Sequence, residues 1–137
     1  MKTALITHAD CLDHVTPFGH PEQVARLEHV LHALASLELN RVTASLAADD
    51  DLLRIHPKFY IDEIKKMRPE SGTFQVDADT HMSPGSVDAA YRAAGGTLRA
   101  VDMVLSGEAK NAFVAARPPG HHAETATAMG FCLFGNV

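Results

Sequence analysis

The chain has 137 residues, 46% of them hydrophobic, and a formal net charge of −5 from 12 basic and 17 acidic side chains. This length and apolar fraction are typical of one globular domain, so we expect a single domain over residues 1–137 and exclude the disordered class of proteins. The acidic balance, without a basic stripe, argues against direct binding to a nucleic-acid backbone and suits a cationic partner better.

Two cysteines, Cys11 and Cys132, are present, one near each end of the chain. In a chain without a secretory leader, this usage is typical of free thiols in a reducing compartment, and a disulfide is the alternative. The apolar run at the start is too short for a signal peptide, and we expect no membrane-spanning segment. We therefore expect a cytoplasmic protein.

Short apolar runs alternate with helical periodicity along the chain. Strands are predicted at residues 4–7, 41–46, 111–116 and 131–134, and helices at residues 21–34, 49–54, 57–67 and 83–107. The strand at residues 111–116 is expected to be buried. Pro21 suits a first helical position, and Ser83-Pro84 offers a cap followed by such a proline. Asp49 is a candidate cap for the short helix, and Gly107 can end the longest one.

This order of elements predicts an α/β fold. Helices of ten or more residues between apolar strands indicate a parallel sheet with helices on both faces. Ligands of such sheets bind at the carboxyl ends of the strands. Because the loop of residues 117–130 follows the strand predicted at residues 111–116, we expect the functional site in this loop.

The loop contains the most informative stretch of the sequence. It consists of Arg117-Pro118-Pro119-Gly120-His121-His122-Ala123, followed closely by Gly130-Phe131-Cys132. The two prolines stiffen the entry to the loop, and Gly120 lets the backbone turn or approach a ligand closely. Imidazole titrates near neutrality, so His121 and His122 together can hold one protonated ring and one free base. The alternative is that both are merely polar residues of a solvated loop.

This segment resembles the signature of the histone deacetylase superfamily, including bacterial acetylpolyamine amidohydrolases and histone deacetylase-like amidohydrolases. Other blocks resemble family motifs in the same order: His20-Pro21-Glu22 with Arg26-Leu27, Leu53-Arg54-Ile55-His56 with Tyr60, Asp77-Ala78-Asp79-Thr80, and residues 83–104 around Gly95-Gly96. The resemblance covers nearly the whole chain and implies the arginase/deacetylase fold, incomplete here as the amino-terminal part of a catalytic domain. It also implies hydrolysis of the acetamide of acetyl-lysine or acetylpolyamine substrates.

The resemblance implies roles for single residues. His122 would be the general base, and His121 would remain largely protonated as its electrostatic partner. Phe131 would line the narrow tunnel for the acyl-lysine, and Gly130 would offer backbone to the substrate amide. Asp79 would be the rim carboxylate that grips the substrate backbone.

Other assignments have ordinary structural alternatives. Asp79 could equally be a turn or cap residue. Arg26, which resembles an arginine lining an internal channel behind the metal, could be a helix-surface cation. His20 and His56 are expected to be structural, and Cys132 is expected to be a packed core thiol rather than a nucleophile.

The resemblance implies a zinc cofactor for the complete domain. In the family, zinc polarises the acetamide carbonyl for attack by bound water, whose pKa zinc can lower to about 7. The family's metal ligands, two aspartates and a histidine, lie in motifs beyond the equivalent of Val137, as does its transition-state tyrosine. We therefore assign no metal ligand in this chain and expect the 137 residues alone to be inactive.

Three hypotheses follow. The first is the amino-terminal part of a zinc-dependent deacetylase, and the second is a non-catalytic module that binds acyl-lysine, a polyamine or another chain. The third is a different hydrolase in which some of the nine histidines form an unrecognised metal site. A sheet that stops after the strand predicted at residues 131–134 would leave an unpaired edge, so we also expect self-association into a homo-oligomer.

Overall fold

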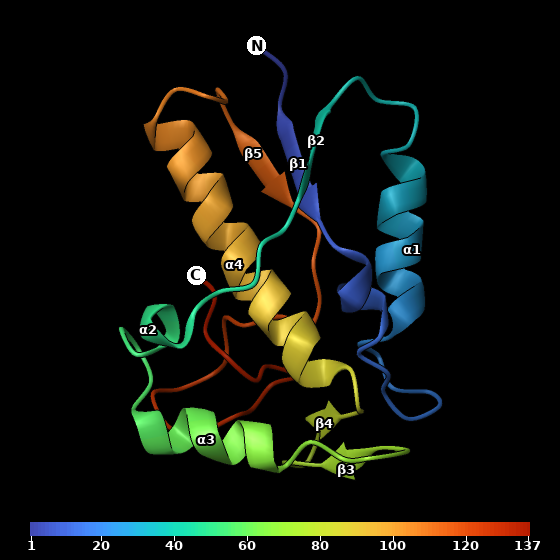
Figure 1. The fold of residues 1–137 in the computed structure, drawn as a ribbon. Coiled ribbons are helices and arrows are strands. Elements are labelled where there is room, and N and C mark those ends of the chain that lie inside the picture. Colours follow the sequence, from blue (N-terminus) through green and yellow to red (C-terminus); the bar gives the residue numbers. More distant parts are fainter.

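Three parallel strands form the central sheet of the computed structural model, which describes residues 1–137 (Figure 1). β1 (Ala4–Thr7) lies between β2 (Asn40–Thr43) and β5 (Ala112–Val114) and pairs with both. β1 occupies the centre because its first three residues, all apolar, are buried from both sides.

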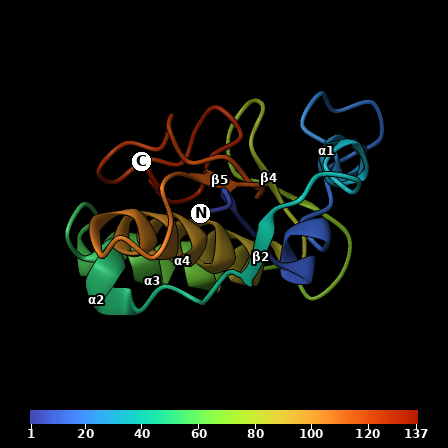
Figure 2. The same cartoon turned by 90° about the horizontal axis from the view of Figure 1, so that it is seen from above.

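Helices cover both faces of this sheet, as predicted (Figure 2). Successive side chains of a strand point to opposite faces, so neighbouring residues of β1 meet different helices. Ile6 belongs to a buried cluster that includes α4 (Ser86–Leu105), whereas Leu5 packs with Leu27 of α1 (Val24–Ala33). The α/β fold with a parallel sheet between helices is therefore confirmed.

The remaining elements lie beyond the carboxyl ends of the strands (Figure 1). They are the 3-10 helix η1 (Ala9–Leu12), the helices α2 (Asp49–Leu52) and α3 (Lys58–Lys66), and the short antiparallel pair β3 (Phe74–Gln75) and β4 (His81–Met82). The strand predicted at residues 4–7 and the helix predicted at residues 57–67 agree with β1 and α3. None of the helices combines the length and apolar character needed to cross a bilayer.

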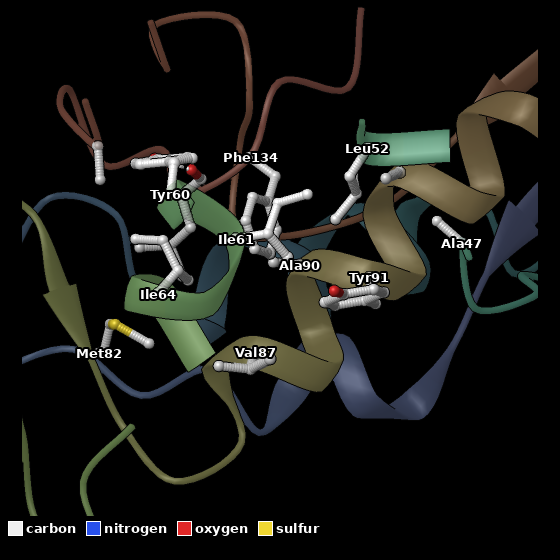
Figure 3. Packing of buried hydrophobic residues seen from close by; sticks show 13 residues of the cluster. Ala47, Leu52, Tyr60, Ile61, Ile64, Met82, Val87, Ala90, Tyr91 and Phe134 are labelled. Atoms are coloured by element: carbon white, nitrogen blue, oxygen red, sulfur yellow. Dashed lines mark hydrogen bonds between the residues drawn. The ribbon is translucent and has the colours of Figure 1, made fainter. Parts of the chain in front are cut away.

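The largest cluster of buried side chains joins α3 and α4 to the last residues of the chain (Figure 3). Phe134 packs edge-on against the rings of Tyr60 and Tyr91, with ring centroids 6.1 and 5.4 Å apart. The Tyr60 hydroxyl also donates a hydrogen bond to the carbonyl of Leu133. These contacts fix the segment that follows the His-His loop against the helical layer.

The first long helix begins later than predicted. Pro21 precedes the helix instead of opening it, and α1 starts at Val24. The reason is local: His20 Nδ1 accepts a hydrogen bond of 3.1 Å from the backbone N–H of Glu22, which holds these residues in a turn. This turn places the Glu22 side chain in the protein interior, where it is 6% exposed.

The longest helix also starts after its predicted cap. Ser83 lies before the helix, and the cap position is Gly85. The hydroxyl of Ser86, the first helical residue, accepts a hydrogen bond of 2.7 Å from the backbone N–H of Ser83. The predicted end is confirmed, because Gly107 follows the helix with a φ of 78°, which a glycine adopts without strain.

Asp49 is the first residue of α2 and does not cap it. The residue before the helix is Ala48, whose backbone N–H donates a hydrogen bond of 2.9 Å to Asp51 Oδ2. Asp49 instead accepts hydrogen bonds from Lys65 of α3, at 2.7 Å, and from Tyr91 of α4, at 2.5 Å. Its carboxylate therefore connects three helices.

The second strand is shorter than predicted, because the backbone that follows it bonds to and packs against α4. β2 ends at Thr43, and the next carbonyl, that of Ala44, accepts a hydrogen bond of 2.9 Å from Arg92. Gly95 then lies so close that an added Cβ would be 2.1 Å from the carbonyl oxygen of Ser45. The chain at residues 44–46 consequently follows the helix and leaves the sheet.

Two predictions about the C-terminal strands are wrong. β5 is not fully buried, since the Phe113 side chain is 51% exposed at the edge of the sheet. No strand forms at residues 131–134, because Phe131 has a φ of 71° and Met129 and Cys132 pair across a tight turn. The sheet edges are therefore β2 and β5, and the unpaired edge predicted after residues 131–134 does not exist.

Candidate functional site

The loop that carries the two histidines leaves the carboxyl end of β5 (Figure 1). It starts at Arg117, whose side chain is completely buried. Arg117 forms two hydrogen bonds with the carboxylate of Glu22, from Nε at 3.0 Å and from Nη2 at 2.7 Å. Its third nitrogen, Nη1, donates to the carbonyl oxygens of Cys11 and His14. The entry to the loop is thereby attached to three other segments of the chain.

Gly120 allows the loop to lie directly on the C-terminal segment. A Cβ at this position would be 2.2 Å from Asn136 Oδ1 and 2.5 Å from the carbonyl oxygen of Phe134. Only a residue without a side chain fits this contact. The close contact at this glycine is with the protein's own backbone and side chains, and the predicted approach to a ligand stays a prediction.

The rings of His121 and His122 lie side by side, with centroids 4.2 Å apart and planes tilted by 50°. Both residues are exposed on the surface of the structure. His122 is held by two contacts with the segment that follows the loop. Its backbone N–H donates a hydrogen bond of 3.4 Å to Cys132 Sγ. Its Cβ lies so close to Gly130 that a Cβ added to this glycine would be 2.7 Å away. The main chain is therefore fixed at His122, while the side chains of both histidines remain exposed.

Cys132 is a packed, free thiol, as predicted. It is completely buried, and its Sγ donates a hydrogen bond of 3.2 Å to the carbonyl of Gly130. Burial raises the pKa of this thiol above its usual range, which opposes formation of a nucleophilic thiolate. Its contact with His122 makes it a support for the histidine pair.

The predicted rim residue is close to the predicted tunnel residue. The hydroxyl of Thr80 accepts a hydrogen bond of 3.1 Å from the backbone N–H of Phe131 and donates one of 3.2 Å to Asp79 Oδ1. His20 Nε2 donates to the carbonyl of Asp79 at 2.7 Å, and its ring packs edge-on against Phe131 with centroids 4.9 Å apart. Asp79 is exposed, so its carboxylate is accessible.

Arg26 lies at the start of the loop and not beside the histidine pair. Its Nη2 donates a hydrogen bond of 2.8 Å to the carbonyl of Ala116, and its Nε donates one of 3.3 Å to Glu22 Oε1. Its side chain is 46% exposed. It is therefore more than a surface cation, since it attaches α1 to the residue before Arg117.

His56 anchors the far side of the loop, as predicted for a structural histidine. Its Nε2 accepts a hydrogen bond of 2.9 Å from the backbone N–H of Gly135, and its Nδ1 donates one of 2.9 Å to the carbonyl of Thr125. A cleft of about 350 Å³ lies between this region and His121. His122 and Phe131 do not line that cleft.

Sequence reasoning missed three residues of the site. Glu22 and Thr80 are polar residues within quoted motifs, but nothing in the sequence shows that they hold Arg117 and Phe131. His14 stands in no motif of the sequence, yet it is 1% exposed and bonds to Ser86 through Nδ1 at 2.7 Å. Burial, assisted by the charge of Arg117, lowers the pKa of His14 to about 3.

The chain brings no three or more His, Cys, Asp and Glu side chains together in a way that could hold a metal ion. The residues present therefore do not fit a zinc site by themselves. This finding also removes support for the hypothesis that the histidines form a metal site of their own.

Comparisons with known proteins agree on one family. The family model for the histone deacetylase domain matches residues 20–137. The chain is 41% identical over 125 residues to a histone deacetylase-like amidohydrolase of Pseudomonas aeruginosa, covering 87% of this chain and 32% of that protein. It is 34% identical over 143 residues to a probable deacetylase of Archaeoglobus fulgidus, covering 100% of this chain and 39% of that protein.

A solved structure, that of the HDA15 HD domain, has the same fold. It superimposes with a TM-score of 0.90 at 29% sequence identity, covering 98% of this chain and 41% of that chain. The chain therefore spans well under half the length of each of these similar proteins.

Proposed function

Because the chain belongs to the histone deacetylase domain family, we propose that it provides the proton-transfer loop and part of the substrate rim of an amidohydrolase. The substrate class is an acetamide, carried by acetyl-lysine or by an acetylpolyamine. The observation that supports this proposal most is the histidine pair, whose rings lie side by side with centroids 4.2 Å apart and whose main chain is held at His122 by Cys132. A polar pair on a freely solvated loop would not need such support.

His122 acts as the general base in this proposal. Its ring takes the proton from the water that attacks the acetamide carbon and returns a proton to the leaving amine. His121 is the electrostatic partner of His122 in the same proposal, since the two rings lie side by side with centroids 4.2 Å apart. Both side chains are exposed and can contact substrate and water.

The rim residues bind and orient the substrate. Phe131 offers an apolar wall to the methylene stem of the acyl-lysine, and the neighbouring backbone of Gly130 receives the amide. Asp79 accepts a hydrogen bond from the substrate backbone, or pairs with the cationic part of a polyamine. The link through the Thr80 hydroxyl, 3.1 Å from the Phe131 N–H and 3.2 Å from Asp79 Oδ1, keeps these two contacts at a constant separation.

Zinc remains our proposal for the complete domain, with ligands from outside these 137 residues. The roles of His121, His122 and the rim residues use only side chains and backbone of this chain, because the residues present do not form a metal site. Arg26 remains a candidate channel residue on its contact with the carbonyl of Ala116.

The proposal is tested by acetamide hydrolysis in the full-length protein that contains this chain. We expect turnover of an acetyl-lysine peptide or an acetylpolyamine, and His122→Ala should lower kcat by about a hundredfold, the usual contribution of a general base. His29→Ala is the matched control, since His29 is an exposed histidine that contacts only its own helix, at the carbonyl of Ala25. Equal kcat values for His122→Ala and the wild-type protein would show that His122 is not the general base.

A non-catalytic binding module is the second candidate. It is favoured by the cleft between His56 and His121, which neither His122 nor Phe131 lines. The two candidates differ in one result: a module binds acetyl-lysine without releasing acetate even when the full-length protein is supplied with zinc, whereas an amidohydrolase releases it.

A further inference from the structure

The Arg117–Glu22 ion pair is buried at the start of the loop that carries the two histidines. The Arg117 side chain is 0% exposed and that of Glu22 is 6% exposed, and the two groups share two hydrogen bonds, one to each carboxylate oxygen. Removing two charges from water is unfavourable, and a well-packed apolar pair often stabilises a fold equally well. A buried, bidentate pair is better explained by the geometry that it specifies.

The pair connects the start of the histidine loop to four separate segments. Arg117 Nη1 bonds to carbonyls in η1 and in the turn after it, those of Cys11 at 3.1 Å and of His14. Glu22 precedes α1, and the His14 ring connects to the first turn of α4 through Ser86. A shift of the guanidinium would therefore have to move several packed elements at once.

Glu22 is the anion on which the buried Arg117 depends. Glu22 Oε1 also accepts a hydrogen bond of 3.3 Å from Arg26, so one carboxylate serves two guanidinium groups. His14 Nε2 lies 3.6 Å from Glu22 Oε2, but burial and the charge of Arg117 keep this imidazole neutral. No second anion is in position to hold Arg117 if Glu22 is lost.

Arg117 is close enough to His121 along the chain for its fixed position to restrict the histidine pair. Only Pro118, Pro119 and Gly120 separate Arg117 from His121. The prolines restrict φ, and Gly120 is fixed against Asn136. Building on the proposed function, we propose that Arg117 and Glu22 are positioning residues, which place the His121–His122 pair for proton transfer without touching the substrate.

The test uses Arg117→Lys and Glu22→Asp in the full-length protein. Both variants keep the charges but lose the bidentate geometry. We expect kcat for an acetyl-lysine peptide to fall by about a hundredfold, the size of effect produced by a displacement of about 1 Å, with KM nearly unchanged. The backbone amide of His122, which bonds to Cys132, should exchange its hydrogen faster in both variants.

Arg92→Lys is the matched control. Arg92 also pairs with a carboxylate, Asp10 at 2.8 Å, and with a carbonyl, Ala44 at 2.9 Å, but it has no contact with the loop. Arg92→Lys should lower the melting temperature, while kcat and the hydrogen exchange of the His122 amide stay as in the wild-type protein.

Three results would overturn the inference. They are folded Arg117 and Glu22 variants with unchanged kcat and His122 exchange, failure of both variants to fold, and an equal loss of kcat in Arg92→Lys. The first two would assign the pair to stability alone, and the third would show that the loss of kcat is not specific to the pair. If the unchanged protein cleaves no acetamide, the proposed function fails, and the exchange of the His122 amide alone decides whether Arg117 and Glu22 position the pair.

Discussion

The ring of His122 is close to Gly130, and this contact leads to a sharp prediction. Gly130 has a φ of 57°, and an added Cβ would be 2.7 Å from the Cβ of His122. Gly130→Ala should therefore destabilise the fold and displace His122, with a fall in kcat of up to about a hundredfold. Urea unfolding and acetamide turnover measure the two effects.

Gly72→Ala is the control for this substitution. Gly72 also has a positive φ, 66°, but no atom lies within 4 Å of an added Cβ. It should lower the free energy of unfolding by only about 1–2 kcal/mol, the cost of a side chain in this conformation, and leave turnover unchanged. If both glycine variants lost activity equally, the contact with His122 would not be the cause.

His14 predicts a loss of stability in acid. Burial lowers its pKa to about 3 in the folded chain, whereas the unfolded chain keeps the ordinary value of 6.5. Below pH 6.5 only the unfolded state takes up the proton, so stability is complete above this pH and is lost as the pH falls toward 3. At pH 5 the loss should be about 2 kcal/mol.

Denaturant unfolding between pH 8 and pH 5 measures this loss. His14→Gln should flatten the pH dependence, and replacement of the exposed His32 should leave it as it is. A stability that stays level down to pH 5 in the unchanged protein would show that His14 is not a buried neutral base.

How well these residues could be predicted depends on how local their signals are. His121 and His122 stand in a compact motif, and the sequence is sufficient to single them out. Glu22 and Arg117 are 95 residues apart, and neither has a neighbour that marks it as buried. Only the folded chain shows that they form a pair.

For the secondary-structure elements, periodicity predicted the order of strands and helices well and their ends less well. The ends differ where a tertiary contact replaces a local one. Arg92 takes the carbonyl of Ala44 and so ends β2 early, and the turn at His20 delays α1. The strand predicted at residues 131–134 failed because its apolar residues serve a turn and a core contact instead.

Because α4 lies so close to the chain after β2, we expect Gly95→Ala to destabilise the fold, although helix propensity alone would favour alanine. Gly95→Ala replaces a poor helix former by the best one, which in an open helix would stabilise by about 1 kcal/mol. Here the Cβ would be 2.1 Å from the carbonyl oxygen of Ser45, so we expect a loss of about 1–3 kcal/mol from overpacking.

Gly96→Ala provides the comparison within the same helix. Its nearest contact would be the Cβ of Ala44 at 3.2 Å, which leaves room for a small adjustment. Thermal unfolding should place Gly96→Ala well above Gly95→Ala in melting temperature. The reverse order would mean that residues 45–47 can move away from α4 at little cost.

Across the complete chain, the fold class was predictable because a buried parallel sheet leaves a strong pattern of apolar runs and long helices. What the sequence could not give is which strands are exposed. β5 forms an edge and exposes Phe113, although its residues are as apolar as those of a buried strand. Self-association of the 137 residues remains a prediction, now with β5 as the edge concerned.

The most direct measurement is a crystal structure of the full-length His122→Ala variant with an uncleaved acetyl-lysine peptide. The account predicts the acetamide beside the truncated side chain of residue 122, the methylene stem against Phe131, and the peptide backbone at Asp79. An acetamide bound away from the histidine pair, with Phe131 and Asp79 untouched, would contradict it.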